Sequence, residues 1–268
     1  MRGYSLLLFV LFALIPAGSS ACPRVLGYKD LNCDGKFTVL FIGDSVVSGT
    51  GDIGDKGGYV RRLQSRLPDI TRQKIGMRGV STSELLANLQ GWIKPRGHLT
   101  AEARSIIAAD YIVLDVGRND FYEILEADWG TPEIVINMAA EAVRHIREMV
   151  IRLKAELRRR KRPSPRFSVA TLLPTNRDFQ RFYIDGVSTL LLTHVTPNLP
   201  VDVPFHTIDA ELISIFPPDG LHPTPAGYNA MADMMADLIQ SRFWRRPAPT
   251  PTPLPSSKKV QSDQQWFQ

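Results

Sequence analysis

The chain has 268 residues, and 44% of them are hydrophobic and 22% are charged. It is therefore long and apolar enough to bury one sizeable core, and it is neither fibrous nor wholly disordered. The formal net charge is +5, but Arg2 contributes +1 and the tail from Arg245 onward +3, which leaves +1 for residues 22–244. The body of the protein thus lacks the electrostatic footprint of a nucleic-acid-binding protein.

Residues 1–21 have the three parts of a secretory signal peptide. A positive start at Arg2 precedes an apolar run over residues 4–15, and small residues follow up to Ala21. We expect cleavage after Ala21 and therefore a secreted or periplasmic protein. The apolar run is shorter than the ~20 residues that a membrane-spanning helix needs, and no other stretch qualifies, so we expect no membrane span.

The two cysteines of the sequence, Cys22 and Cys33, follow this signal in the N-terminal segment 22–36. Disulfides persist in the compartments to which signal peptides lead, so we expect the two residues to pair. A disulfide that closes a loop of this size stabilises a fold by roughly 2–3 kcal/mol. Attachment of a lipid at Cys22, as in a bacterial lipoprotein, is the alternative. It fits less well because Ser19 stands where such signals have an aliphatic residue.

Residues 30–35 copy the first six positions of a calcium-binding loop. The twelfth position of such a loop must supply a bidentate carboxylate, but here it is Phe41, inside an apolar run. We therefore expect a turn rather than a calcium site. No cluster of cysteine, histidine or carboxylate side chains has the spacing of a zinc site either, so we expect no metal.

Strand patterns alternate with helix patterns over the expected folded domain, residues 37–244. The expected strands are 38–42, 72–75, 111–116, 167–173 and 205–208. The expected helices are 59–67, 83–90, 101–109, 132–160, 179–192 and 225–243. Strands that alternate with helices form parallel crossover units, so the pattern predicts an α/β fold with a parallel sheet of about five strands.

The helix expected over 132–160 has the clearest pattern, because its apolar residues recur at steps of three and four. Positive charges are favourable at a helix C-terminus. We therefore interpret the basic run at its end, residues 158–162, as stabilising the helix rather than as a nucleic-acid site. From residue 245 onward the chain is rich in proline, which favours an extended, unpacked conformation. We therefore expect residues 245–268 to be a disordered tail.

Polar motifs stand near the beginning and the end of the folded domain. Gly43-Asp44-Ser45 follows the first strand, and open α/β sheets bind ligands at the carboxyl ends of their strands. Asp219 and His222 are three residues apart, so one turn can hold the carboxylate close to the imidazole. A hydroxyl, an imidazole and a carboxylate together suit acyl transfer. We predict Ser45 as nucleophile, His222 as general base and Asp219 as the residue that orients the imidazole.

Two segments between these motifs contain groups that can stabilise an oxyanion. A glycine turn, residues 76–82, follows the second strand, and a glycine lets backbone N–H groups approach a substrate oxygen closely. The third strand is followed by Gly117-Arg118-Asn119-Asp120, in which the amide of Asn119 can donate a hydrogen bond.

These four segments, in this order, resemble the SGNH hydrolases, also called the GDSL esterase/lipase family, over about residues 38–239. The resemblance implies a flavodoxin-like three-layer α/β/α sandwich that hydrolyses esters and thioesters without a metal or organic cofactor. It also implies an oxyanion hole formed by the backbone N–H groups of Ser45 and Gly79 and the side-chain amide of Asn119. Gly76 is the alternative to Gly79 as the backbone donor. We prefer Gly79 because this choice aligns the following Leu85 with the pattern of the family.

We therefore predict a secreted serine esterase that hydrolyses carboxylic esters. No long apolar lid is visible, which favours small acyl groups on a polar or carbohydrate alcohol. A lysophospholipase or thioesterase of the same family remains open, as does a non-catalytic secreted binding module on the same fold. The expected partner is a small-molecule or carbohydrate ester, and the sequence does not determine the oligomeric state.

Overall fold

The computed structural model describes residues 22, 24–52, 57–93, 99–121, 132–173, 178–195, 201–202 and 222–244. The strands are β1 (Arg24–Val25), β2 (Tyr28–Lys29), β3 (Thr38–Gly43), β4 (Thr71–Gly76), β5 (Tyr111–Asp115), β6 (Arg166–Val169) and β7 (Val201–Asp202). The helices are α1 (Ser45–Ser48), α2 (Gly58–Arg66), α3 (Thr82–Trp92), α4 (Ala101–Ala108), α6 (Pro132–Arg159), α7 (Asp178–Leu190) and α8 (Pro225–Phe243). A 3-10 turn, η1 (Asn119–Phe121), and a π-helical turn, η2 (Leu191–Val195), complete the described elements.

Five of these strands form one parallel sheet in the order β4-β3-β5-β6-β7. Counted along the chain, this order is 2-1-3-4-5, the flavodoxin-like doubly wound arrangement. The expected α/β fold with a five-stranded parallel sheet is thus confirmed. In the register of the sheet, Gly43 of β3 lies opposite both Gly76 of β4 and Asp115 of β5. Three neighbouring strands therefore end level at one edge of the sheet.

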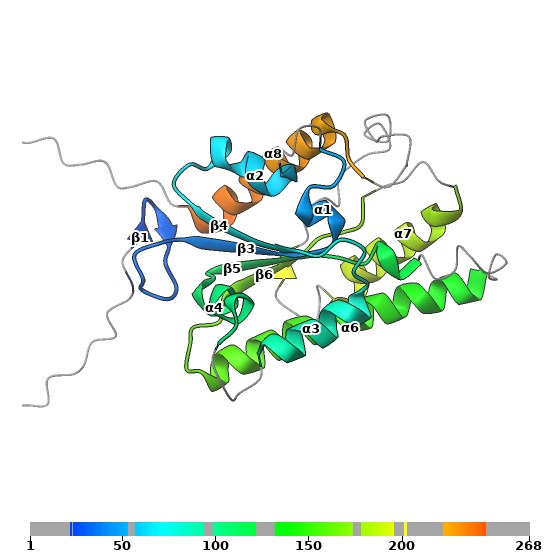
Figure 1. Cartoon of the computed structure of the whole chain (residues 1–268), viewed down its shortest axis with the longest axis horizontal. Helices are drawn as coiled ribbons and strands as arrows, with labels where there is room; N and C mark the ends of the chain where they lie inside the picture. Colours follow the sequence, from blue (N-terminus) through cyan, green and yellow to red (C-terminus); the bar gives the residue numbers. More distant parts are fainter. Residues whose placement is uncertain are drawn as a thin grey trace, which may run out of the picture.

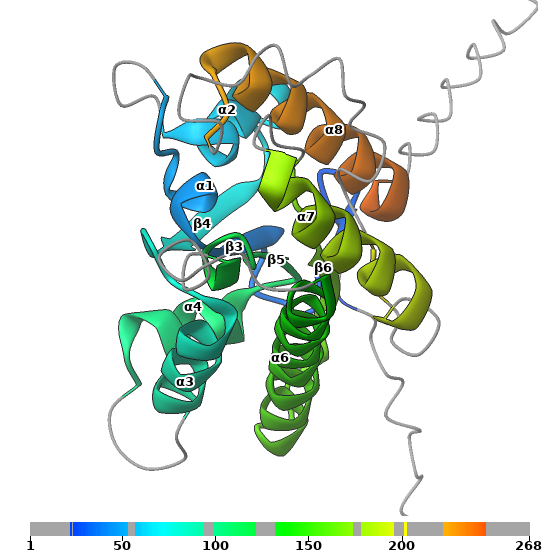
Figure 2. The same ribbon diagram turned by 90° about the vertical axis from the view of Figure 1, so that its right-hand side faces the viewer.

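Helices cover both faces of the sheet. Figure 1 shows α2 and α8 on one side and α3, α4 and α6 on the other, and Figure 2 shows the same layers turned by 90°. Leu40 and Ile42 of β3 belong to the core shared with α3, α6 and α7. Val39 and Phe41 belong to the core shared with α2 and α8. Because both faces are covered, every residue of β3 is buried, as is typical of a central parallel strand.

A disulfide links the two ends of the N-terminal segment, and hydrogen bonds join the segment to the sheet. Cys22 and Cys33 form the expected disulfide, with their Cα atoms 5.0 Å apart. The carboxylate of Asp30 accepts hydrogen bonds from the backbone N–H groups of Asn32, Cys33 and Gly35, so residues 30–35 form a turn closed by this side chain.

The carboxylate of Asp110, just before β5, joins the N-terminal segment to the sheet. It accepts hydrogen bonds at 2.7 Å from the backbone N–H groups of Leu31 and Thr38. Burial raises the pKa of Asp110 to about 6, because an ionised carboxylate loses hydration in the interior. The two N–H donors oppose this rise.

Some elements differ from the sequence-based expectation. The strand expected over 167–173 ends at Val169, because its pairing with the central strand β5 ends there, opposite Leu114. Neither β7 nor the four-residue helix α1 was expected, since both are too short to show a periodic pattern. The strand expected over 205–208, the signal peptide and the tail lie outside the described residues.

None of the described helices combines the length and the apolar character that crossing a bilayer requires.

Candidate active site

The level strand ends bring three sequence motifs to one edge of the sheet. The chain leaves β3 into Ser45, β4 into the turn that contains Arg78 and Gly79, and β5 into Arg118 and Asn119. Segments separated by dozens of residues therefore face the same space. This is the edge at which doubly wound sheets bind their ligands.

The turn that presents Ser45 is closely packed and held by hydrogen bonds. A side chain at Gly43 would place its Cβ 1.9 Å from the backbone oxygen of Asp115, so only glycine fits there. The Asp44 side chain caps α1 by accepting a hydrogen bond from the N–H of Val46 at 2.9 Å. Ser45 is the first residue of α1, so its own N–H has no partner within the helix. In the part of the chain that the structure describes, this N–H donates no hydrogen bond.

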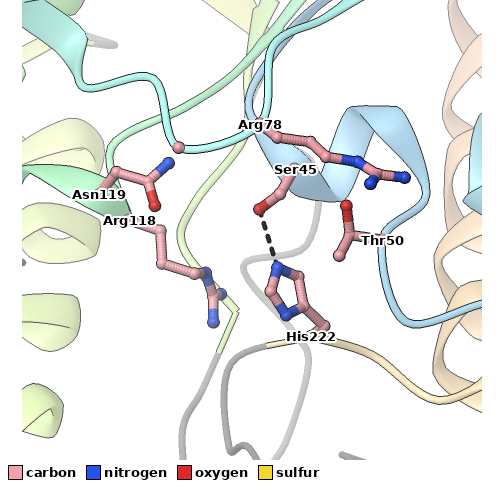
Figure 3. A pocket seen from close by; sticks show the side chains of 7 residues that line it. Ser45, Thr50, Arg78, Arg118, Asn119 and His222 are labelled. Atoms are coloured by element: carbon pink, nitrogen blue, oxygen red, sulfur yellow. Dashed lines mark hydrogen bonds between the residues drawn. The ribbon is translucent and has the colours of Figure 1, made fainter.

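Ser45 and His222 meet at this edge although 177 residues separate them in the sequence. The Oγ atom of Ser45 lies 2.9 Å from Nε2 of His222, and Figure 3 shows this contact at the centre of the site. His222 is held just before α8, which begins at Pro225 and is capped by the side chain of Thr224. Asp219, the expected third member of the triad, lies outside the described residues.

The loop that follows α1 supports His222 from the side. Gly51 has φ +85°, and a Cβ built on it would lie 2.9 Å from the Cβ of His222. The hydroxyl of Tyr228, in α8, donates to the backbone oxygen of Thr50 at 2.6 Å. The loop and the start of α8 therefore stabilise each other, and a side chain larger than that of glycine at residue 51 would displace His222.

The turn after β4 presents Gly79 to the same space. The N–H of Val80 donates to the oxygen of Met77 at 3.2 Å, which closes a β-turn with Gly79 at φ +74°. A positive φ at the third position of such a turn favours glycine. Among the described residues, the N–H of Gly79 finds no acceptor. Gly76 instead ends β4 against α1, since a Cβ there would lie 2.5 Å from Oγ of Ser48.

The side chain of Asn119 is oriented by the same turn. Its Nδ2 donates to the backbone oxygen of Val80 at 2.9 Å. An amide nitrogen has two hydrogens, so this bond fixes the orientation of the amide and leaves a second donor. The neighbouring Asp120 accepts hydrogen bonds from the N–H and the hydroxyl of Thr82 and so fastens η1 to the start of α3. The sequence pattern did not indicate this role of Asp120.

These groups surround a cavity of about 340 Å³. It is lined by Ser45, Thr50, Arg78, Gly79, Arg118, Asn119 and His222. The cavity thus contains a hydroxyl paired with an imidazole, and donors from two backbone segments and one side-chain amide. Such a set can transfer a proton from the hydroxyl and stabilise negative charge on an oxygen bound beside it.

Two buried carboxylates, Asp44 and Asp115, flank the turn that carries Ser45. The hydroxyl of Tyr59 donates to Oδ2 of Asp115 at 2.9 Å. Burial is the main cause that raises the pKa of both carboxylates, and repulsion from Asp115 raises that of Asp44 further. The positive charge of Arg118 acts in the opposite direction on both.

Sequence reasoning missed Asp115, Tyr59 and Arg118. A charged residue at the end of the otherwise apolar run 111–116 was the one available signal for Asp115. Arg118 stood inside a recognised motif, but at its variable position. Of the remaining histidines, His145 of α6 contacts Thr82 and Glu141 and does not line the cavity. The side chains of His98, His194 and His206 lie outside the part of the protein that the structure describes.

The sequence matches the model of one protein family. A model of the GDSL-like lipase/acylhydrolase family matches residues 41–230. No curated protein matches the chain at a significant level.

Solved structures share the fold at low sequence identity. The lipase Lip_vut3 from a goat rumen metagenome is 17% identical, with a TM-score of 0.60 over 75% of this chain and 97% of that chain. A lipase/acylhydrolase from Enterococcus faecalis is 15% identical, with a TM-score of 0.54 over 79% of this chain and 100% of that chain. The psychrotrophic esterase EstA from Pseudoalteromonas sp. is 16% identical, with a TM-score of 0.51 over 76% and 97%. Because the family model covers well over half of the sequence, the chain belongs to the GDSL-like lipase/acylhydrolase family, the SGNH hydrolases.

Proposed function

We propose that the protein is a carboxylic ester hydrolase that works by two-step acyl transfer through Ser45. The observation that carries this proposal is the 2.9 Å contact between Oγ of Ser45 and Nε2 of His222 at a cavity that several hydrogen-bond donors line. A base within hydrogen-bonding distance of a hydroxyl is the geometry that activates a serine nucleophile.

In the first step, Oγ of Ser45 attacks the ester carbonyl while its proton passes to Nε2 of His222. The carbonyl oxygen becomes an oxyanion, and it accepts hydrogen bonds from the N–H groups of Ser45 and Gly79 and from the second amide hydrogen of Asn119. His222 then gives the proton to the departing alcohol. A water molecule then attacks the acyl group, while His222 takes its proton and returns it to Oγ of Ser45 as the acid leaves. Asp219 orients the imidazole in both steps.

The substrate proposed from the sequence is a small acyl group on a polar or carbohydrate alcohol. A cavity of about 340 Å³ supports this proposal, because that volume is near the small end of the range for ligand pockets. A thioester or lysophospholipid substrate and a binding module without turnover are the competing functions. The proposed reaction uses the chain's own side chains, its backbone N–H groups and water.

The disulfide supports the proposal that the protein works in an oxidising compartment, outside the cell or in the periplasm. It also argues against a lipid anchor at Cys22. A sulfur that is bound to Cys33 is not available for a thioether to a lipid.

Hydrolysis of p-nitrophenyl esters with increasing acyl length tests the proposed function. Ser45→Ala should lower kcat by about 10⁴-fold or more, because the nucleophile is lost. Asn119→Ala should lower it by about 10²- to 10³-fold, because one oxyanion donor is lost. Ser65→Ala, which removes an exposed hydroxyl on α2, is the matched control and should retain full activity.

The same series separates the competing functions. A wild-type protein that binds these esters without releasing nitrophenol would be a binding module, and a rate that rises steadily to long acyl chains would favour a lipid substrate. The neighbour EstA was solved inhibited by monoethylphosphonate. We therefore expect an ethylphosphonate ester to block this protein and to add its mass at Ser45.

A further inference from the structure

The charged side chains that line the catalytic cavity are both arginines. Arg78 and Arg118 contribute guanidinium groups, and no carboxylate is among the described residues of the lining. Figure 3 shows their side chains on opposite sides of the Ser45–His222 contact. A bound ester would therefore lie between two positive charges.

We propose, on the basis of the proposed esterase function, that the natural substrate carries an anionic group close to the scissile ester and that Arg78 binds this group. Guanidinium groups suit carboxylates and phosphates because their planar set of donors matches the two oxygens of such groups. Arg78 is the specificity-determining residue in this proposal.

The surroundings of Arg78 give it no structural task. It follows β4 in the turn before Gly79, and its side chain is exposed. Within the described parts of the chain it forms no ion pair and no hydrogen bond. An exposed turn position tolerates almost any residue, so neither packing nor backbone conformation requires an arginine there.

Other positive charges lie close to Arg78 among the described residues. Lys74 has a lowered pKa, mainly through partial burial and also through repulsion by Arg61 and Arg78. Arg61 and Lys74 line a second cavity, of about 510 Å³, together with Gly57, Val60, Gln64, Arg72 and Gln73. Positive charge thus continues from the catalytic cavity along the edge strand β4. Such a field raises the local concentration of anionic substrates.

Protection of the sheet edge against pairing with other chains explains only some of these positive charges. Charged residues on an edge strand hinder pairing with other chains, and this accounts for Arg72 and Lys74 within β4. Arg78 lies beyond the end of that strand and lines the catalytic cavity, where it protects no strand edge.

Arg118 is buried, with 6% of its surface exposed, and Nη2 donates to the backbone oxygen of Leu173 at 2.8 Å. It also offsets the charges of Asp44 and Asp115. Its position is therefore fixed before any substrate arrives. Because its loss would leave those carboxylates uncompensated, the test is made at Arg78.

The test compares ester pairs that differ in one negative charge, each rate being divided by the uncatalysed rate. On the acyl side the pair is mono-p-nitrophenyl adipate and p-nitrophenyl hexanoate. On the alcohol side it is 4-acetoxybenzoate and 4-acetoxybenzamide, with 4-acetoxyphenyl phosphate added to distinguish phosphate from carboxylate. We expect kcat/KM to favour the charged ester by about tenfold or more in at least one comparison.

The variants assign this preference to Arg78. Arg78→Gln should bring the charged-to-neutral ratio of kcat/KM close to one, and a ratio is not affected by a general loss of activity. Arg104→Gln removes the same charge from the exposed face of α4 and should keep the wild-type ratio.

Each outcome has a separate meaning. Hydrolysis of the neutral esters without any preference for charge would overturn the inference and leave the esterase function standing, as would a preference that Arg78→Gln does not reduce. A folded wild-type protein that hydrolyses none of the esters would overturn the esterase function and, with it, this inference.

Discussion

Replacement of Gly51 by alanine tests whether the loop after α1 positions His222. The new Cβ would lie 2.9 Å from the Cβ of His222, whereas carbon atoms in contact are ordinarily about 3.5–4.0 Å apart. The histidine must therefore move by roughly 0.5–1 Å. That movement lengthens its 2.9 Å contact with Ser45 beyond a good hydrogen bond.

The expected loss can be divided into two parts. A displacement of this size at a catalytic group lowers kcat by up to about 10²-fold. Separately, the left-handed backbone conformation of Gly51, with φ +85°, costs an alanine about 1–2 kcal/mol of stability. The first part appears in the steady-state hydrolysis of a p-nitrophenyl ester, and the second in urea unfolding.

Gly35→Ala is the matched control. Gly35 has φ +80°, and a Cβ there would meet nothing within 4 Å. Both variants should lose similar stability, but only Gly51→Ala should lose kcat. Equal values of kcat in the two variants would refute the idea that Gly51 positions the imidazole.

Two predictions concern stability. Asp115→Asn should make the free energy of unfolding less dependent on pH, measured by urea titration at pH 5 and pH 8 beside the exposed control Asp237→Asn. The pKa of Asp115 is raised in the folded state, so the native protein binds more protons than the unfolded chain at intermediate pH, and this contribution is lost as the pH rises through the folded value. A wild-type protein whose advantage over Asp115→Asn grows with pH would contradict this sign. Replacing both Cys22 and Cys33 by serine should lower the free energy of unfolding by about 2–3 kcal/mol without changing kcat, because the N-terminal segment lies away from the cavity; an unchanged unfolding midpoint would show that the disulfide does not stabilise the domain.

The sequence by itself determined the α/β class of the fold and the parallel sheet. Residues 39–42 form an uninterrupted apolar run, which indicates a strand covered on both faces, and the regular pattern of residues 132–160 indicates a long amphipathic helix. Both signals are local, because burial and periodicity can be read within a single element. The four motifs were also readable, since their residue types and their order indicate the chemistry.

Tertiary structure decided which groups meet. The level ends of β3, β4 and β5 result from strand register, which depends on packing among distant segments. Register places Arg78 and Arg118 at the cavity, and the return of the chain before α8 brings His222 to Ser45. It also places Asp115 beside the turn of Ser45, where burial raises its pKa. No local pattern encodes these contacts, because hydrogen-bonding distance across 177 residues is a property of the assembled sheet and helices.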